Sequence, residues 1–275
     1  MVKKRSAGEW LFDAFNVILM IALIVITLYP VYYVALCSIS DSSALLGNRG
    51  VMLLPKGLSP EAYKAVFNNP NIFTGYKTTL IVVVFGTLLN VIMTAVGAFL
   101  VTRKKFAVRK IVSYMMVFTM FFNGGMIPTY MMVYKWLGLG DTLWALILPT
   151  AISTYNLLIM KSNFEALPDS LEEAAAIDGA NDVMVLFRIV LPLSTPIIAV
   201  MVLFYGVTHW NSWFNAMMYI RTRSKYPLQL ILREVLLMND TNGMSASASM
   251  SDQFMIGESI KYATIMVATV PILCV

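Results

Sequence analysis

The segment EALPDSLEEAAAIDGANDVMVLFRIVLP, residues Glu165–Pro192, joins an alanine-rich polar half to an apolar half and lies between two strongly apolar runs. It contains the triplet EAA, a glycine after three further residues, and I-x-L-P after nine more. The residues of this pattern are Glu173, Ala174, Ala175, Gly179, Ile189, Leu191 and Pro192. So many fixed residue types at fixed spacings, between two apolar runs, indicate a segment that binds another protein.

The same segment predicts two short helices. Ser170 and Glu173 have the spacing of a capping box, which would fix where the first helix starts. Gly179 would end that helix, since glycine readily adopts the left-handed conformation at a helix C-terminus. Asn181 or Asp182 would cap a second helix, whose side chains are too apolar for a free surface. We expect the first helix, slim because it is rich in alanine, to bind in a groove of another protein. The second, apolar helix would lead into the next apolar run at Pro192.

The composition indicates a membrane protein with several spans. Of its 275 residues, 59% are hydrophobic and 13% are charged, against about 25% charged residues in soluble domains. Since about 20 apolar residues cross a bilayer, we expect an all-α, single transmembrane domain over residues 1–275. Its six helices would lie near residues 14–36, 78–102, 111–134, 142–160, 192–216 and 260–275. The last run ends at Val275 without a polar flank, which suggests a missing C-terminal tail.

The distribution of basic residues predicts the orientation. With a cytoplasmic N-terminus, the inside segments hold 10 Lys or Arg in 49 residues and the outside segments hold 10 in 85. Residues 103–110 decide this, with five basic residues in eight, because short cytoplasmic loops collect positive charge. Residues 161–191 then form a cytoplasmic loop and residues 221–259 an extracellular one. The net charge of +5 therefore reflects topology, and no aromatic-basic pattern suggests nucleic-acid binding.

Polar side chains inside the predicted spans are candidates for a substrate path. Small and polar residues at helical spacing in the second span predict close packing against another helix, and we assign a lining role there to Asn90 only. Paired glycines and a proline follow Asn123, which predicts a broken helix, because broken backbone at membrane depth must be buried in protein or face a cavity. The candidate path residues are Asn90, Asn123, Tyr155, Asn156, His209, Trp210, Asn211 and Trp213.

Three of these candidates have simpler interpretations that stay open. His209 is the single histidine, and a polar residue in helix packing explains it more readily than ligand contact. Trp210 and Trp213 suit a membrane interface, yet a flat ring beside Asn211 would also stack on a sugar.

The sequence lacks the motifs that several kinds of binding or catalysis require. The chain contains no G-x-x-x-x-G-K-[S/T] phosphate loop, so any ATP must be bound by a partner. The predicted span interiors hold no Asp, Glu, Lys or Arg, whereas proton-coupled carriers place such residues there. One histidine excludes a His-based zinc cluster, and the G-x-S-x-G elbow of hydrolases is absent. We therefore expect a subunit without enzyme activity, bound metal or cofactor.

The EAA pattern, its position between the fourth and fifth predicted spans, and the segment WNSWF around Asn211 resemble the membrane-spanning subunits of carbohydrate-type, maltose-permease-like ABC importers. The segments NGGMIPTY and DGANDV look most similar to Gram-positive oligosaccharide permeases. The resemblance covers nearly the whole chain. It implies a MetI-like, type I importer fold in a bacterial plasma membrane, with the EAA loop forming coupling helices that dock on an ATPase.

The resemblance further implies the partners: a second, non-identical permease, two ATPase subunits that bind ATP and Mg, and an extracellular solute-binding protein that contacts residues 221–259. A sugar or oligosaccharide would be the substrate. The residues implied in coupling are Ser170, Glu173, Ala174, Ala175, Asp178, Gly179, Ile189, Leu191 and Pro192.

Two other classes of function are alternatives. A sodium-coupled carrier working alone needs no ionisable residue in its spans, because hydroxyl and carbonyl groups can bind sodium. A membrane-embedded enzyme is the other alternative. Co-purification with an ATPase would favour the importer subunit, and dependence on a sodium gradient would favour the carrier.

Overall fold

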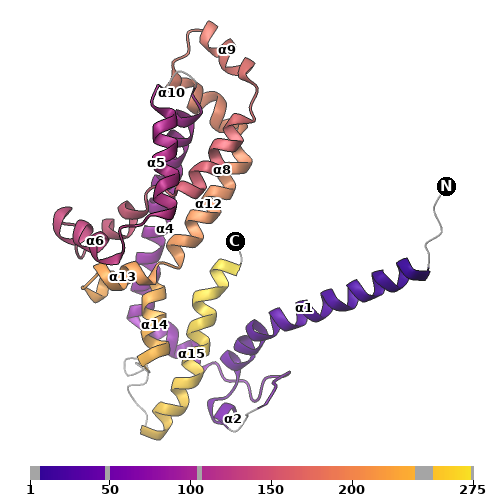
Figure 1. Cartoon of the computed structure of the whole chain (residues 1–275). Coiled ribbons are helices and arrows are strands. Elements are labelled where there is room, and N and C mark those ends of the chain that lie inside the picture. The colour runs from indigo at the N-terminus through magenta and orange to yellow at the C-terminus, as the bar shows by residue number, and fades with distance from the viewer. Residues whose placement is uncertain (1–6, 47–49, 104–106, 239–249, 274–275) are drawn as a thin grey trace. The chain divides into compact units, whose positions relative to one another are not determined.

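The computed structural model describes residues 7–46, 50–103, 107–238 and 250–273. Apart from an isolated β-bridge between Ser40 and Leu58, its regular elements in these ranges are helices. The chain, whose helices are labelled in Figure 1, divides into two compact units. One comprises the residues up to Asn69 together with Glu234–Leu273, and the other comprises Pro70–Arg233.

The first unit is built on two long helices that pack against each other. Its helices are α1 (Ala7–Ile39), α2 (Ser42–Leu46), α3 (Glu61–Asn68) and α15 (Met250–Leu273). The rings of Tyr33 on α1 and Tyr262 on α15 meet edge to face, with centroids 6.3 Å apart. The Ser42 hydroxyl on α2 donates a hydrogen bond to Ser259 Oγ on α15 at 2.9 Å.

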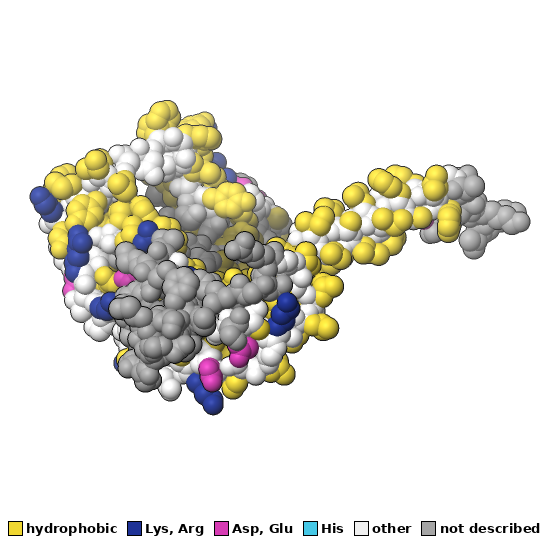
Figure 2. Space-filling model, turned by 90° about the horizontal axis from the view of Figure 1, so that it is seen from below, with side chains coloured by type: hydrophobic (Ala, Val, Ile, Leu, Met, Phe, Trp, Pro, Cys, Tyr) yellow, Lys and Arg dark blue, Asp and Glu magenta, His cyan; other side chains and the backbone are white. Residues whose placement is uncertain are grey.

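Helix α1 exposes apolar side chains all round. Trp10, Ile18 and Ile26 are each more than 60% exposed, and yellow hydrophobic atoms cover the visible side of the helix that extends to the right in Figure 2. A helix that is hydrophobic on every side needs an apolar surrounding. By length and composition, α1 is long and apolar enough to cross a membrane.

The second unit is a bundle around α4, which packs against α8 and α12. Its helices are α4 (Pro70–Thr102), α5 (Arg109–Phe121), α6 (Met126–Met131), α7 (Trp144–Ile147), α8 (Thr154–Glu165), α9 (Asp169–Ile177), α10 (Asp182–Val185), α11 (Leu191–Leu193), α12 (Thr195–Trp210), α13 (Trp213–Tyr219) and the start of α14 (Leu228–Met238). One-turn π-helices cover Met132–Trp136 and Leu186–Val190, and 3-10 turns cover Leu148–Thr150 and Arg223–Lys225. In Figure 1, α9 and α10 lie at one end of this unit.

Glycines on α4 allow neighbouring helices to approach closely, as the small-residue face of this segment predicted. A Cβ at Gly97 would lie 2.8 Å from Leu157 Cδ1 on α8. A Cβ at Gly86 would lie 2.5 Å from His209 Nε2 on α12. Real Cβ atoms do not approach other atoms so closely, so these two glycines set the contact distance of α4 with α8 and α12.

The membrane-length helices are fewer than the six predicted spans, because several apolar runs are broken. Among the described residues, Gly8–Ile39 and Pro70–Thr102 qualify as single helices. Two bent pairs also qualify, Arg109–Phe121 with Met126–Trp136 at 114°, and Asp182–Leu193 with Thr195–Trp210 at 86°. The break predicted after Asn123 is thus confirmed.

Two local predictions for the polar segment and its exit are wrong. The capping box is not formed, because the first helix begins at Asp169 with Pro168 as its N-cap, and no side chain caps it. Ser170 therefore lies inside the first turn. The long helix of the fifth predicted span begins at Thr195 and not at Pro192, which belongs to the short α11. Pro196 stands in the first turn of α12, where a proline costs no intrahelical hydrogen bond.

Candidate functional site

Helix α9 is held on the bundle by one face and exposes the other. Ala175 is 7% exposed and packs into a core cluster that also contains Phe99 of α4 and Leu186. On the other side, Glu173 and Ala174 are exposed, and Ile177 is 87% exposed. The EAA triplet is therefore split: its first two residues face outward, and its last one anchors the helix.

The turn after α9 has the conformation that its glycine predicts. Gly179 has a φ of +78°, which places it in the left-handed region where residues with a Cβ are strained. Asp178 is the C-cap, and its N–H donates to the Ala174 carbonyl. Asn181 then caps α10, since its side-chain oxygen accepts a hydrogen bond from Met184 N at 2.8 Å. This confirms the first of the two predicted caps.

The chain continues from α10 to α12 through tightly joined short helices. The π-helix Leu186–Val190 connects α10 to α11, and the backbone then bends by 86° at Ser194 to enter α12. Val185, Leu186 and Val190 are buried in the same core cluster as Ala175, whereas Ile189 and Leu191 are partly buried against it and Pro192 is exposed. The apolar half of the segment thus contacts the bundle and leads directly into α12.

A cavity of about 720 Å³ opens between α4, α8 and α12 in the second unit. It brings together four of the candidate path residues, Asn90, Tyr155, Asn156 and His209. Tyr155 is 59% exposed, and Asn156 is buried in the first turn of α8. The other lining residues are Pro149, Thr150, Ile152, Ser153, Leu203, Phe204, Tyr205, Val207 and Thr208.

Hydrogen bonds between helices stabilise one wall of this cavity. Asn90 is fully buried; its amide nitrogen donates to the Thr150 carbonyl, and its Oδ1 lies 3.0 Å from His209 Nε2. Thr94 and Tyr205 join their hydroxyl groups at 2.7 Å. His209 is 3% exposed and contacts Asn90, as its packing interpretation predicts, and it also lines the cavity.

The remaining candidates lie outside the cavity. Asn123 accepts a hydrogen bond from Gly125 N at 3.0 Å, so it stabilises the helix break. Trp210 is buried with its ring edge against Tyr76, and the Trp213 ring lies 4.8 Å from the Arg233 guanidinium carbon. Asn211 lines a smaller cavity of about 170 Å³, which shares Thr150, Thr208 and His209 with the first one.

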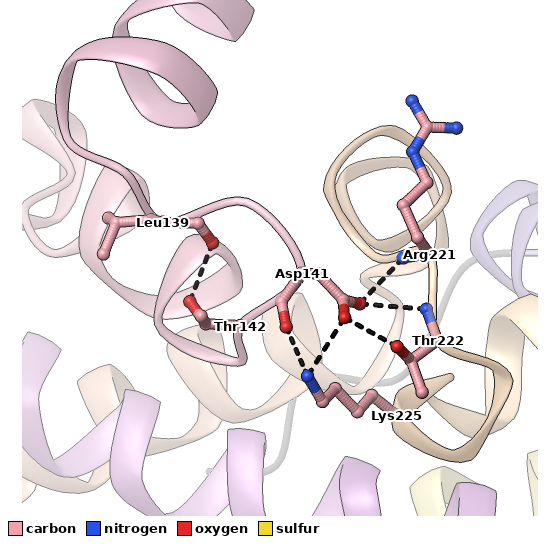
Figure 3. Close-up of polar contacts among 6 residues, drawn as sticks. All are labelled: Leu139, Asp141, Thr142, Arg221, Thr222 and Lys225. Atoms are coloured by element: carbon pink, nitrogen blue, oxygen red, sulfur yellow. Dashed lines mark hydrogen bonds and ion pairs between the residues drawn. The ribbon is translucent and has the colours of Figure 1, made fainter.

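The sequence patterns do not predict a cluster of hydrogen bonds between Asp141 and residues 221–225, which we call the Asp141 clamp (Figure 3). Asp141 Oδ1 accepts hydrogen bonds from the backbone N–H groups of Arg221 and Thr222, both at 2.9 Å. Its Oδ2 accepts from the Thr222 hydroxyl at 2.6 Å and from Lys225 Nζ at 3.1 Å. These bonds, led by the Thr222 hydroxyl, hold the pKa of the Asp141 carboxyl well below its usual range.

A local signal for this clamp exists in the sequence, because Gly138 and Gly140 announce a tight turn before Asp141. Asp141 itself has a φ of +56°, a conformation in which Asp and Asn are enriched. The residues that it binds lie about 80 positions further along the chain, and no local pattern points to them.

Comparison with known proteins gives a consistent result. Residues 92–273 match the family model described as "Binding-protein-dependent transport system inner membrane component". Protein LplC of Bacillus subtilis (strain 168) is 39% identical over 273 residues, covering 98% of this chain and 90% of that protein. The polygalacturonan/rhamnogalacturonan transport system permease protein YtcP of the same organism is 39% identical over 272 residues, covering 96% and 92%.

A solved structure has the same fold. A chain in the crystal structure of a bacterial ABC transporter for import of the acidic polysaccharide alginate superposes with a TM-score of 0.88 at 28% identity, covering 98% of this chain and 95% of that chain. The fold is thus the MetI-like permease fold, and these matches give no support to a sodium-coupled carrier. YtcP is named a permease protein, and the family model describes a transport-system component, so the chain is a transport subunit and not an enzyme. The chain belongs to the family of binding-protein-dependent transport system inner membrane components.

Proposed function

We propose that this chain is one half of the translocation path of an ATP-driven importer for sugars or oligosaccharides, and that α9 is its coupling helix. The observation that carries the proposal is the two-faced α9, with Ala175 buried in the bundle and Glu173, Ala174 and Ile177 exposed. Exposed Ile177 at the end of a slim alanine helix suits a groove in another protein. Residues Ser170 and Asp178 are also exposed on α9 and flank this surface.

The partners that we propose follow from this surface and from the family. A second permease would complete the path, and two ATPase subunits would bind ATP and Mg and receive α9 of each permease. An extracellular solute-binding protein would contact residues 221–259. The family description, which names binding-protein-dependent transport, supports this last partner.

We further propose six spans with a cytoplasmic N-terminus. The two single helices and the two bent pairs account for four crossings. The run of α7 and α8, over residues 142–160, and the apolar part of α15, Ser259–Leu273, would supply the other two. In this arrangement the basic residues 103–110 and helix α9 share the cytoplasmic side, in agreement with the positive-inside rule.

The cavity between α4, α8 and α12 is the part of the path that we assign to the substrate. The described residues that line it offer hydroxyl and amide groups and aromatic faces, and no carboxylate or ammonium group. Such a lining suits hydroxyl-rich ligands, since amides and hydroxyls can both donate and accept hydrogen bonds. The polysaccharide-related names of YtcP and of the alginate importer support a sugar as substrate.

The coupling role is tested by pull-down and transport assays on two variants, Glu173→Ala and Ile177→Ser. We expect both to reduce co-purification of the ATPase and ATP-dependent uptake, because they remove the exposed ridge of α9. Glu165→Gln is the matched control, as Glu165 is a half-exposed carboxylate just before α9, paired with Lys161 on its own helix. Normal ATPase binding and uptake in both α9 variants would refute the proposal. Uptake that requires a sodium gradient and no ATP would instead support the carrier.

A further inference from the structure

An ion pair connects α9, the proposed coupling helix, to the end of α4. Arg103, directly after the last residue of α4, pairs through Nη1 with Glu172 Oε2 in the first half of α9. The Arg103 side chain is 17% exposed and that of Glu172 is 32% exposed. The two residues are 69 positions apart in the chain, so the pair is a tertiary contact and not a product of local helix geometry.

The guanidinium group of Arg103 is held in place by α4 as well. Its central carbon lies 3.7 Å from the centroid of the Phe99 ring, a distance at which cation and ring attract each other. Phe99 is 4% exposed and belongs to the core cluster that also contains Ala175. Among the described residues, Arg103 Nε and Nη2 are buried without a hydrogen-bond partner, so Glu172 supplies the charge that compensates this cation.

Glu172 and Ala175 are three residues apart on α9 and therefore share one face of the helix. Ala175 fixes this face by packing, and Glu172 fixes it by charge. Glu173 and Ala174, which we propose for contact with the ATPase, are exposed. The ion pair thus links α9 to the end of α4 and leaves the exposed side of α9, with Glu173 and Ala174, free to contact the ATPase.

We propose that Arg103 is a positioning residue that makes α4 follow α9 when the ATPase moves. The covalent path leads from α9 through α10 and α11 to α12. The Arg103–Glu172 pair adds a path to α4, so two walls of the substrate cavity move together. This inference rests on the proposed coupling role of α9, and it adds a residue outside the EAA segment to the coupling machinery.

The test uses the reconstituted importer with its ATPase and binding protein. The variants are Arg103→Gln, Glu172→Gln and the double variant, with Lys161→Gln/Glu165→Gln as the matched control, since that pair joins residues of one helix. We expect each single variant to keep ATPase binding and to lower uptake per ATP hydrolysed roughly tenfold, because α4 would no longer follow α9 once the ion pair is broken. The double variant should be no worse than the single ones, since the two residues act through one contact.

A distance measurement separates positioning from general destabilisation. Spin labels at Leu100 and Ala176, both on exposed positions, in a Cys37→Ser/Cys274→Ser background should report one narrow distance with and without ATP. Arg103→Gln should broaden it. Unchanged uptake per ATP in the single variants, additive losses in the double variant, or an unchanged distance distribution would overturn the inference. If Glu173→Ala loses ATPase binding while the Arg103 and Glu172 variants keep normal uptake per ATP hydrolysed, the role of the ion pair is refuted and the coupling role of α9 stands.

Discussion

At the scale of single residues, Gly86 decides how α4 meets α12. The missing side chain leaves room for the His209 ring, whose Nε2 lies 3.0 Å from Asn90 Oδ1. Asn90 and His209 are both buried, and a buried polar group without its hydrogen bond is costly. The glycine therefore permits both the close approach of the helices and the polar contact in the cavity wall.

We expect Gly86→Ala to destabilise the protein by about 1–3 kcal/mol, the usual range for an overpacked contact. The new Cβ would lie 2.5 Å from His209 Nε2 and would displace the ring from Asn90. The measurement is the thermal unfolding midpoint of the detergent-solubilised protein. Gly206→Ala is the control on the facing helix, because its Cβ would meet Thr87 Oγ1 at an ordinary 3.9 Å. Equal effects of both changes would contradict the prediction.

Asp141 is the second residue whose chemistry holds distant segments together. Its carboxylate accepts two backbone and two side-chain hydrogen bonds from residues 221–225. These donors favour the charged form, which is why the pKa of this group lies below its usual value. The backbone of Asp141 has positive φ, so Asn is the substitution that changes the charge and keeps the preferred backbone conformation.

We expect Asp141→Asn to lower the unfolding midpoint at pH 7, since an amide nitrogen would face Lys225 Nζ. The pKa of Asp141 is lower in the folded than in the unfolded state. Its contribution to stability is therefore complete above the unfolded pKa, about 3.9, and is lost as pH falls through the folded value. The difference between wild type and variant, measured by thermal unfolding from pH 7 downward, should narrow only below about pH 4. A difference that is constant down to pH 3 would contradict the charge explanation.

At the scale of elements, broken helices are the feature that distinguishes the second unit. The chain leaves α5 at Phe122 in extended conformation and re-enters a helix at Met126, after Gly125 with a φ of +86°. The segment after α9 likewise uses Gly179 and a bend at Ser194. These breaks place short helices at an angle to the long ones, which allows α9 to project a free face from a packed bundle.

The turn at Gly179 is the element-scale test of coupling. Apart from the adjoining backbone, no atom of the residues that the structure describes would lie within 4 Å of a Cβ at Gly179. Gly179→Val would therefore act through backbone strain, about 1–2 kcal/mol. We expect this variant to reorient α9 and to reduce co-purification of the ATPase, with Gly179→Asn less affected because Asn tolerates the left-handed region. The measurement is the ratio of ATPase to permease after pull-down.

Gly138→Val is the control for the Gly179 variants. Gly138 also has positive φ, +64°, and no described residue would lie within 4 Å of a Cβ there, yet it lies in the turn before the Asp141 clamp. The same strain there should leave ATPase binding intact. If Gly138→Val and Gly179→Val reduce binding equally, general destabilisation and not the geometry of α9 explains the effect.

At the scale of the whole molecule, the proposed topology places α9 and the Asp141 clamp on opposite sides of the membrane. Each bent pair counts as one crossing in this topology. The coupling movement would then enter at α9 and reach the cavity between α4, α8 and α12 from the cytoplasmic side. The extracellular segment from residue 221 onward would stay available for a solute-binding protein.

Labelling of intact cells with a membrane-impermeant maleimide tests this topology. The cells express a protein in which both native cysteines are replaced (Cys37→Ser/Cys274→Ser), so that only an introduced cysteine can react. Ile177→Cys, at a position that is 87% exposed, should react only after the membrane is opened. Arg223→Cys, also at an exposed position, should react in intact cells. Both variants are expressed without the ATPase, so that no partner covers α9. Labelling of both sites from the same side would require a different number of spans between them.

The sequence by itself determined the all-α membrane class, the breaks at Gly125 and Gly179, a helix cap at either Asn181 or Asp182, and the EAA pattern within residues 165–192. These features depend on apolar content and on the turn chemistry of adjacent residues, which are readable locally. It also predicted the close packing of the second span, since small residues recurred on one helical face. It misplaced the starts of two helices, at Ser170 and Pro192, because proline and capping signals compete over a few neighbouring positions.

Only the tertiary structure decided which distant groups meet. Asn90 and His209 are 119 positions apart, and Arg103 and Glu172 are 69 apart. It also separated the candidate path residues into those that line the main cavity and those, such as Asn123 and Trp213, that do not. The physical reason is that a buried polar or charged side chain must find a partner, and packing of whole helices determines which partner comes within reach.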